Sequence, residues 1–377
     1  MTDKRLRVGV IFGGRSGEHE VSVMSARGIL KALDPARFEA VPIGIDRDGR
    51  WQLVEPRALL APGQAGADRV GEGSLARASD SSARALASGD VGSGAIERQE
   101  LSDLPKRFGV DVFFPIVHGS QGEDGALQGL LEMAGAPYVG CGVLGSAVGM
   151  DKDVSKRLLR DAGLPIVDFI VVRAGAPAGA ALAQRVEAEL GYPCFVKPAN
   201  LGSSVGVSKV RSAAELPGAL AEAFRYDRKL VVERGIDARE IETAVLGVAP
   251  PEVSLPGEIV PRHEFYSYEA KYLDPEGAEL VVPARLSEEQ TREVQRLSLR
   301  AFEALELEGL ARVDFFLDKN DGRWFVNEVN TLPGFTEVSM YARMWQHTGL
   351  AYRDLVTRLV ELALERFEAR RRLETRV

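Results

Sequence analysis

Two predicted strands near the carboxyl end constrain this chain more than any other feature. They span Ala311 to Leu317 and Trp324 to Val329, and the segment 320–322, Asn-Asp-Gly, lies between them. We expect a three-residue hairpin loop with its glycine in the left-handed region, a loop class that carries a bulge. Such a loop places Lys319 opposite Arg323 and thereby sets the register of both strands.

This register gathers polar side chains on one face of the hairpin. Asp314 then faces Glu328, and Arg312 faces Asn330. A two-residue Asp-Gly turn would instead direct one carboxylate into the core, where an unpaired charge is costly, so the longer loop is favoured. The opposite face is predicted to be a core face made of Val313, Phe315, Leu317, Phe325 and Val329.

The gathered side chains predict a metal and phosphate site. Two carboxylates and a carboxamide supply oxygen ligands of the kind that Mg²⁺ prefers, and an arginine beside them can hold phosphate oxygens. A solvated surface hairpin with compensating charges is the alternative that the same residues allow.

The amino-terminal part of the chain alternates strand and helix patterns, which is typical of a mostly parallel α/β sheet. The predicted strands are Leu6 to Phe12, Phe38 to Ile45 and Val110 to Val117, and the predicted helices are Val21 to Leu33 and Ala126 to Ala134. Few large apolar residues occur in Ala61 to Glu100, so we expect a surface insertion near 61–100.

Near Asp151 the pattern changes to that of a small α+β domain. Its predicted helices are Val154 to Ala162 and Ala180 to Leu190, and its predicted strands are Phe169 to Val172, Phe195 to Pro198 and Lys229 to Glu233. The remainder adds a strand at Glu240 to Leu246 and helices at Glu288 to Leu305 and Tyr352 to Arg370. We therefore expect an α/β domain at 1–147, a central domain at 148–236 and a carboxyl-terminal domain at 237–377.

Composition argues against nucleic acids and membranes as partners of this chain. The 47 basic and 55 acidic residues give a formal charge of −8, so no large cationic field is available for a nucleic-acid backbone. No stretch reaches the roughly 18 apolar residues that a membrane span needs, so we expect no membrane partner. The two cysteines, Cys141 and Cys194, have neither disulfide nor zinc spacing and fit a reducing cytoplasm.

Phosphate-binding loops of the commonest kinds are absent from the sequence. No Gly-Lys dipeptide occurs, which excludes a P-loop, and the turn at 13–17, GGRSG, lacks the dinucleotide-binding spacing. A second segment, Lys197 to Val207, joins a strand lysine to a loop of small residues that could fold over a triphosphate. An ordinary hairpin loop is the alternative for that segment.

Five separated segments, taken together, resemble the D-alanine:D-alanine ligase family. They are HGSQGEDG at 118–125, GMDKD at 149–153, KPANLGSSVGVSKV from residue 197, EAKY at 269–272 and NEVNTLPGFT at 327–336. The resemblance runs nearly end to end and implies an ATP-grasp fold of three domains. It further implies ATP and two Mg²⁺ ions, for which Mn²⁺ can substitute, a monovalent cation as activator, a cytoplasmic location and a homodimer formed through the amino-terminal domain.

For ATP, the resemblance assigns roles to matching positions of this sequence. It implies that phosphates are held by Lys152, Lys197, Ser204 and Lys271, the adenine by the hinge from Glu233 to Ile236, the ribose by Glu240, and two magnesium ions by Asp314, Glu328 and Asn330. At the hinge, Arg234-Gly235 lacks the large aromatic residue of some members, which removes a stacking partner for adenine.

For the amino acids, the resemblance implies a second set. Glu20 and His118 would bind the first D-alanine, Ser339 and the Met340 backbone the second, Glu20, Ser203 and Tyr272 would form a hydrogen-bonded set, and Arg312 with the Gly334 N–H would stabilise the oxyanion. Taken singly, each residue has a plainer interpretation. Glu18 and Glu20 suit the first turn of any helix, His118 could be structural, Tyr272 a surface tyrosine and Lys152 a solvated one.

The implied reaction is ligation of two D-alanine molecules through an acyl phosphate, for peptidoglycan precursors. Because water would hydrolyse the acyl phosphate, we expect the Tyr272 and Ser203 segments to close together over the substrates. Two alternatives remain. A D-alanine:D-lactate ligase is disfavoured because Tyr272 is present, and a nucleotide-binding regulator without catalysis is disfavoured because Arg312 and the acidic residues are intact.

Overall fold

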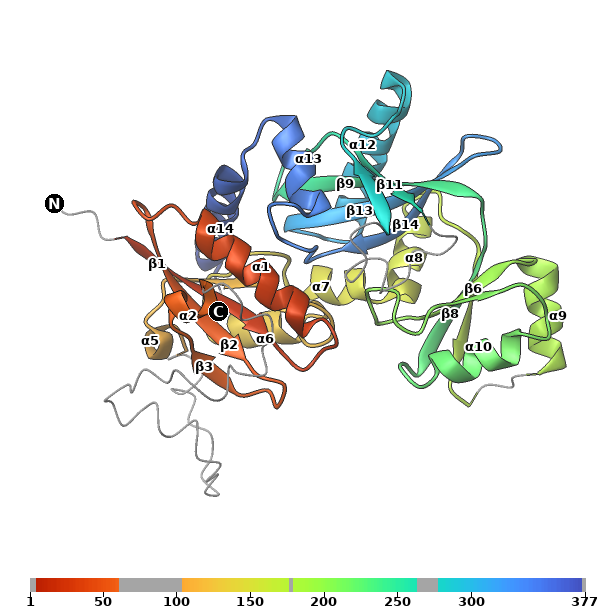
Figure 1. Ribbon diagram of the computed structural model, residues 1–377, viewed down its shortest axis with the longest axis horizontal. Coiled ribbons are helices and arrows are strands. Elements are labelled where there is room, and N and C mark those ends of the chain that lie inside the picture. Colours follow the sequence, from red (N-terminus) through yellow and green to blue (C-terminus); the bar gives the residue numbers. More distant parts are fainter. Residues whose placement is uncertain (1–4, 61–103, 176–178, 263–276, 375–377) are drawn as a thin grey trace, which may run out of the picture.

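The computed structural model describes residues 5–60, 104–175, 179–262 and 277–374, which form three sheets with helices around them (Figure 1). Each of the predicted ranges 1–147, 148–236 and 237–377 contains one of these sheets. The predicted insertion at 61–100 and the EAKY segment, with Lys271 and Tyr272, lie outside the described residues.

The amino-terminal sheet has the strand order β3-β2-β1-β4. Its strands are β1 (Leu6–Gly13), β2 (Phe38–Ile45), β3 (Trp51–Leu53) and β4 (Val112–Pro115). β1 is parallel to β2 and β4, which confirms the expected mostly parallel sheet, while β3 pairs antiparallel with β2. Val8, Val10 and Ile11 are fully buried because both faces of β1 are covered. The helices of this part are α1 (His19–Ala32), α2 (Pro56–Leu60), α5 (Leu104–Phe108), α6 (Ala126–Met133) and α7 (Val143–Met150).

The central sheet is antiparallel throughout and has the order β5-β8-β6-β7. Its strands are β5 (Phe169–Arg173), β6 (Cys194–Pro198), β7 (Ser208–Val210) and β8 (Lys229–Arg234), and its helices are α8 (Lys152–Asp161), α9 (Ala180–Glu189) and α10 (Leu216–Ala223). α9 and α10 lie beside the sheet and share a hydrophobic core with it through Val186, Leu220 and Val196 (Figure 1). The segment 199–207 therefore joins the antiparallel pair β6 and β7.

The carboxyl-terminal sheet has the order β12-β11-β9-β13-β14, with β10 paired to β9. Its strands are β9 (Ala238–Gly247), β10 (Glu252–Val253), β11 (Gly257–Pro261), β12 (Ala278–Val281), β13 (Gly309–Asp318) and β14 (Trp324–Asn330). α12 (Glu288–Ala304) packs Val294, Leu297 and Phe302 onto this sheet. It begins with a capping box, in which the Ser287 side chain accepts from the Gln290 N–H and the Gln290 side chain accepts from the Ser287 N–H.

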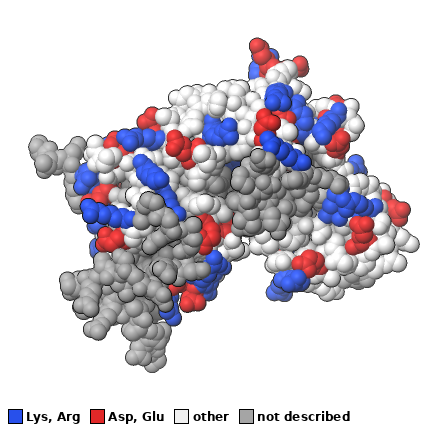
Figure 2. All heavy atoms as spheres, in the orientation of Figure 1, with Lys and Arg blue, Asp and Glu red and all other residues white. Residues whose placement is uncertain are grey.

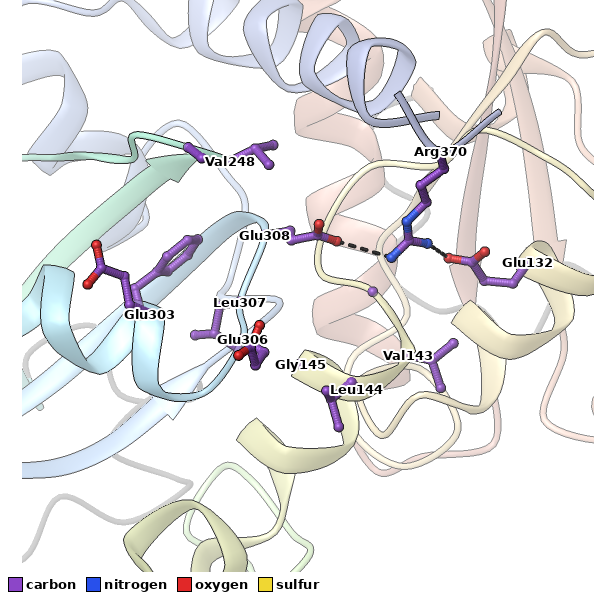
Figure 3. Close-up of a pocket in the computed structure, with 13 residues that line it drawn as sticks. Glu132, Val143, Leu144, Gly145, Val248, Glu303, Glu306, Leu307, Glu308 and Arg370 are labelled. Carbon is purple, nitrogen blue, oxygen red and sulfur yellow. Dashed lines mark hydrogen bonds and ion pairs between the residues drawn. The ribbon is translucent and has the colours of Figure 1, made fainter. Parts of the chain in front are cut away.

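The last two helices of the chain are α13 (Met340–Thr348) and α14 (Tyr352–Arg371). Leu355 and Leu359 of α14 belong to the same buried cluster as Val8 and Phe114 of the amino-terminal sheet. At its far end, Arg370 lies between Glu132 and Glu308 (Figure 3). The neighbouring hollow of about 740 Å³ is lined by none of the predicted site residues.

The surface carries no large field of one sign on the face drawn in Figure 2, where basic and acidic side chains are interspersed. Within the described ranges, no helix is both long enough and apolar enough to cross a bilayer.

Candidate active site

The hairpin of β13 and β14, which we call the acidic hairpin, has the predicted register at its polar end but reaches it by another route. Arg312 pairs with Asn330 and Asp314 with Glu328, as expected. The three-residue loop is wrong: Asp318 and Arg323 close a loop of four residues, 319–322, through Asp318 N–H to Arg323 O at 2.9 Å. A bulge opposite Asp314 and Phe315 inserts Asn327 and restores the register at the polar end. Gly322 has the predicted left-handed backbone, with φ +72°.

The same shift corrects the predicted core face. Between loop and bulge, Phe316 pairs with Phe325 and Leu317 with Trp324, so Phe325 turns to the polar face. Trp324 and Val326 are buried in its place, together with the correctly predicted Val313, Phe315, Leu317 and Val329. Phe325 instead lines a small pocket with Arg234, Gly235 and Ile236 of the predicted adenine hinge.

Arg312 is the centre of the polar face. Its Nε and Nη2 donate to the two carboxylate oxygens of Asp314, each at 2.7 Å, and Nε lies 3.1 Å from Glu242 Oε2. Asn330 Nδ2 donates to Asp314 Oδ2 at 2.9 Å. Burial alone would lower the pKa of Arg312, but Asp314 and Glu242 outweigh it and raise that pKa well above the ordinary value, so the guanidinium stays charged. These buried pairs exclude the interpretation as a solvated surface hairpin.

Sequence reasoning missed Glu242, although a signal was present. Glu242 lies two residues after Glu240 in β9, and residues two apart share a face of a strand. In the structure Glu242 pairs with Asp314 and Glu240 with Phe316, so both acids lie on the polar face of the sheet. The ribose role predicted for Glu240 is thus compatible with its position, and it stays a prediction.

Two predicted phosphate lysines approach the acidic hairpin from the central domain. Lys152, at the start of α8, lies 3.6 Å from Glu328 Oε2 and donates to the Leu201 carbonyl at 2.6 Å. With a side chain only 13% exposed, it is not the solvated lysine that its sequence context allowed. Lys197 donates to Glu233 Oε2 at 2.7 Å, so the hinge carboxylate holds a lysine that we expect to bind phosphate.

A third lysine, Lys156, was not predicted. Its Nζ lies 3.4 Å from Glu233 Oε1, and both side chains are almost completely buried. Burial lowers the pKa of Lys156, while the pKa of Glu233 is lowered because the two neighbouring lysines outweigh the opposing effect of burial. Burial opposes the positive charge of Lys197, but Glu233 outweighs it and raises the Lys197 pKa.

The segment between β6 and β7 contacts the amino-terminal domain through Glu18, which corrects one prediction. The Ser203 hydroxyl donates to Glu18 Oε1, whereas Glu20 pairs with Arg47 at 3.2 Å and is 46% exposed. The predicted Glu20–Ser203 hydrogen bond is therefore wrong. The reason is helical geometry: Glu18 lies directly before α1, and two residues further on the helix has turned by about 200°.

His118 and Ser339 lie at the predicted site, but their polar atoms have protein partners. His118 is 3% exposed, with Nε2 at 3.1 Å from Ser25 Oγ and Nδ1 at 3.1 Å from the Leu332 carbonyl. The Ser339 hydroxyl donates to the Thr336 carbonyl at 2.6 Å and accepts from the Thr336 N–H. Met340 begins α13, so its backbone N–H belongs to a helix amino terminus that suits a carboxylate.

The donor set of the acidic hairpin fits a divalent cation with phosphate ligands. It offers the oxygens of Asp314, Glu328 and Asn330, which are hard ligands of the type that Mg²⁺ prefers. The part of the chain that the structure describes gathers no three His, Cys, Asp or Glu side chains into a metal cluster. Such a site therefore needs oxygens from a bound phosphate to complete the coordination shell.

Family profiles and individual relatives identify the same family in both the amino-terminal and the carboxyl-terminal parts of the chain. The family profile described as "D-ala D-ala ligase N-terminus" matches residues 7–141, and "D-ala D-ala ligase C-terminus" matches residues 158–361. A "D-alanine--D-alanine ligase A" of Chromobacterium violaceum is 52% identical, with 96% of each chain covered, and one of Escherichia coli is 47% identical, with 99% of each covered.

Solved structures give the same result. The D-alanine-D-alanine ligase from Coxiella burnetii superposes with a TM-score of 0.80 at 38% identity, covering 97% of this chain and 96% of that one. VanG D-Ala:D-Ser ligase from Enterococcus faecalis superposes with a TM-score of 0.78 at 31% identity, covering 96% of this chain and all of the other. These likenesses confirm the expected three-domain ATP-grasp architecture.

Proposed function

Since this chain belongs to the D-alanine–D-alanine ligase family, we propose that it joins two D-alanine molecules into D-alanyl-D-alanine for peptidoglycan synthesis, with conversion of ATP to ADP. The observation that carries this proposal is the acidic hairpin, where a partly buried arginine, two carboxylates paired across the strands and a carboxamide lie within reach of a lysine from the central domain. A nucleotide-binding regulator would not need Arg312 among these acids.

In the first step, the carboxylate of one D-alanine attacks the terminal phosphorus of ATP, and ADP leaves. Both reactants are anions, so the barrier is lowered mainly by positioning and neutralisation. Lys152 and Lys197 supply positive charge from the central domain, and the prediction adds Lys271 and a hydrogen bond from Ser204. Asp314, Glu328 and Asn330 would hold a divalent cation, which would supply further positive charge near the phosphate oxygens.

In the second step, the amine of the other D-alanine attacks the carbonyl carbon of the acyl phosphate, and phosphate leaves. Negative charge develops on the carbonyl oxygen, where Arg312 and the Gly334 N–H stabilise it. The Ser339 turn and the Met340 N–H receive the carboxylate of this second D-alanine. Glu18, rather than Glu20, receives the ammonium group of the first D-alanine, because Glu18 is the carboxylate that meets Ser203.

The Glu18–Ser203 contact also closes the site. It links the amino-terminal domain to the segment between β6 and β7, which lies beside the phosphate lysine Lys197. Closure there excludes water, which would otherwise hydrolyse the acyl phosphate. We include Tyr272 in this closing set, as the sequence predicts.

Finer features belong to the same proposal. We propose two Mg²⁺ ions with Mn²⁺ as a substitute, activation by a monovalent cation, a homodimer, a cytoplasmic location where ATP is available, and domain boundaries near 147 and 236. One structural neighbour is a D-Ala:D-Ser ligase, so the identity of the second amino acid needs an experimental test.

Product analysis tests the proposed function. The purified chain is incubated with ATP, Mg²⁺ and D-alanine, with and without an equal concentration of D-serine or D-lactate. We expect D-alanyl-D-alanine as the main product in all three mixtures. A mixed product in excess of the dipeptide would replace the proposed second substrate.

A further inference from the structure

The segment that carries Gly334 is held on both sides by buried side chains from other elements. On one side, His118 Nδ1 lies 3.1 Å from the Leu332 carbonyl. On the other, Phe335 N–H donates to Ser25 Oγ at 3.3 Å, and the Tyr352 hydroxyl donates to the Phe335 carbonyl at 2.9 Å. Gly334 lies between these two attachment points.

The hydrogen bonds of His118 and Ser25 form a closed loop that starts and ends at this segment, and a donor can be assigned to each bond. His118 Nδ1 faces two acceptors, the Leu332 carbonyl at 3.1 Å and Glu123 Oε1 at 3.5 Å, and we assign to the ring the tautomer in which Nδ1 is the donor. Nε2 then accepts, and the Ser25 hydroxyl donates to it at 3.1 Å. The same hydroxyl oxygen accepts from Phe335 N–H, which leads back to the segment.

The residues that form these hydrogen bonds are buried, so the loss of any one bond is costly. Ser25 and Phe335 are fully buried, and His118 and Tyr352 are 3% and 7% exposed. A buried donor or acceptor left without its partner costs about 1–3 kcal/mol, so the backbone of the segment would shift rather than tolerate the loss. The approach is also close, because a Cβ at Gly28 would meet the Tyr352 hydroxyl at 2.9 Å and the Phe335 carbonyl at 3.3 Å.

We propose that Ser25 is a positioning residue which, with His118 and Tyr352, fixes the Gly334 N–H where the oxyanion forms. Ser25 acts through the segment and does not contact the substrates. The inference rests on the proposed function, in which that N–H stabilises the oxyanion. It also gives His118 a role that uses both ring nitrogens, and it couples the amino-terminal domain to the second chemical step.

The test uses two substitutions, each with a matched control on the full chain. Ser25→Ala is compared with Ser22→Ala, a fully buried serine on the same helix that bonds Gly13 N and the Ile116 carbonyl instead. Tyr352→Phe is compared with Tyr341→Phe, another buried tyrosine, whose hydroxyl donates to the Val245 carbonyl at 2.8 Å. Ser25→Thr keeps the hydroxyl and serves as the conservative variant.

For Ser25→Ala we expect kcat to fall about tenfold or more, because small displacements of a catalytic donor have large effects, with KM for ATP and D-alanine within about twofold of wild type. Affinity for a phosphinate dipeptide analogue, which mimics the tetrahedral species, should fall in the same proportion. Tyr352→Phe should act in the same sense but less strongly, and Ser25→Thr should recover much of the rate. The two controls should keep their kcat even where they unfold at lower temperature.

Wild-type kcat in Ser25→Ala would overturn the inference, and so would equal losses in the control variants. A wild-type chain that forms no dipeptide would reject the proposed function, and this inference with it. Dipeptide formation that Ser25→Ala leaves unchanged would reject only the inference.

Discussion

The acidic hairpin and the segment between β6 and β7 hold their polar side chains by different means. In the hairpin, Arg312 is fixed by two 2.7 Å hydrogen bonds to a buried carboxylate within one sheet. In the segment, Ser203 and Ser204 have left-handed backbones, with φ of 51° and 58°, and Ser203 reaches across to Glu18 of another domain. The first arrangement is preformed by the fold, whereas the second depends on two domains meeting.

This difference suggests a division of labour. A charge array built into a sheet keeps its geometry before any substrate binds, which is what electrostatic stabilisation of a transition state requires. A contact between domains, made through strained backbone, can form and break at moderate cost, as a closing segment must. Substitutions in the hairpin should therefore affect the rate of chemistry, and those at Glu18 should mainly affect substrate capture.

The largest effect is expected for Arg312→Ala. It removes the stabilising charge at the oxyanion, so kcat should fall on the order of 10³-fold, while ATP binding stays largely intact. Coupled ADP release and calorimetric ATP titration measure the two quantities. Arg292→Ala, at an exposed pair with Glu288, is the control and should leave both unchanged. Retained turnover in Arg312→Ala would remove this residue from the mechanism.

Lys156→Met tests how much the buried pair of Lys156 and Glu233 contributes to the free energy of unfolding. Glu233 would keep Lys197 but lose its second buried partner, and breaking a buried pair costs about 3–5 kcal/mol of unfolding free energy. Urea unfolding measures the loss. Lys319→Met is the matched control, since it breaks an exposed pair with Asp237 and should cost less than about 1 kcal/mol. Equal losses in the two variants would show that burial of Glu233 carries no special weight.

Glu18→Gln and Glu20→Gln separate the two acids at the start of α1. Glu18→Gln should raise KM for the first D-alanine by about tenfold or more, because it removes the carboxylate that meets both the ammonium group and Ser203. Glu20→Gln loses only a partly exposed pair with Arg47 and should change KM by less than about twofold. Initial rates at varied D-alanine concentration decide, and the reverse ranking would restore Glu20 to the site.

The smallest expected effect is a change in how the free energy of unfolding depends on pH. Because the folded-state pKa of Glu233 lies below its ordinary value of 4.5, its ionised form stabilises the fold fully above pH 4.5, and that stability is lost as the pH falls. Unfolding free energy should therefore fall less steeply below pH 4.5 in Glu233→Gln than in wild type. Denaturant titrations between about pH 3 and 6 measure both slopes, and identical slopes would contradict the lowered pKa.

Local patterns predicted most of the fold. Strands such as Phe38–Ile45 and helices such as Ala180–Glu189 follow directly from the periodicity of their apolar residues. Short elements were missed: α10 contains proline and glycine, and β7 has only three residues. The shared core of α14 and the amino-terminal sheet was also missed, since contacts between distant segments leave no periodic signal.

At the site, the acidic hairpin shows both the strength and the limit of sequence reasoning. The polar pairs were correct because an assumed three-residue loop has the same effect on register as a four-residue loop followed by a bulge. Phe325 exposes the error, because it lies between the loop and the bulge, where the two registers differ. Glu18 could not be selected in advance, since its role depends on where the central domain places Ser203. Lys156 could not be selected either, since its role depends on where the fold of its own domain places Glu233, 77 positions further along the chain.

We propose that the acidic hairpin and the lysines facing it form a site that makes peptide bonds. The most direct measurement is the amount of dipeptide and ADP produced from D-alanine, ATP and Mg²⁺ by the purified chain. We expect D-alanyl-D-alanine and ADP in equal amounts, and neither in Arg312→Ala above a trace. ADP without dipeptide, or dipeptide formed equally well by Arg312→Ala, would contradict it.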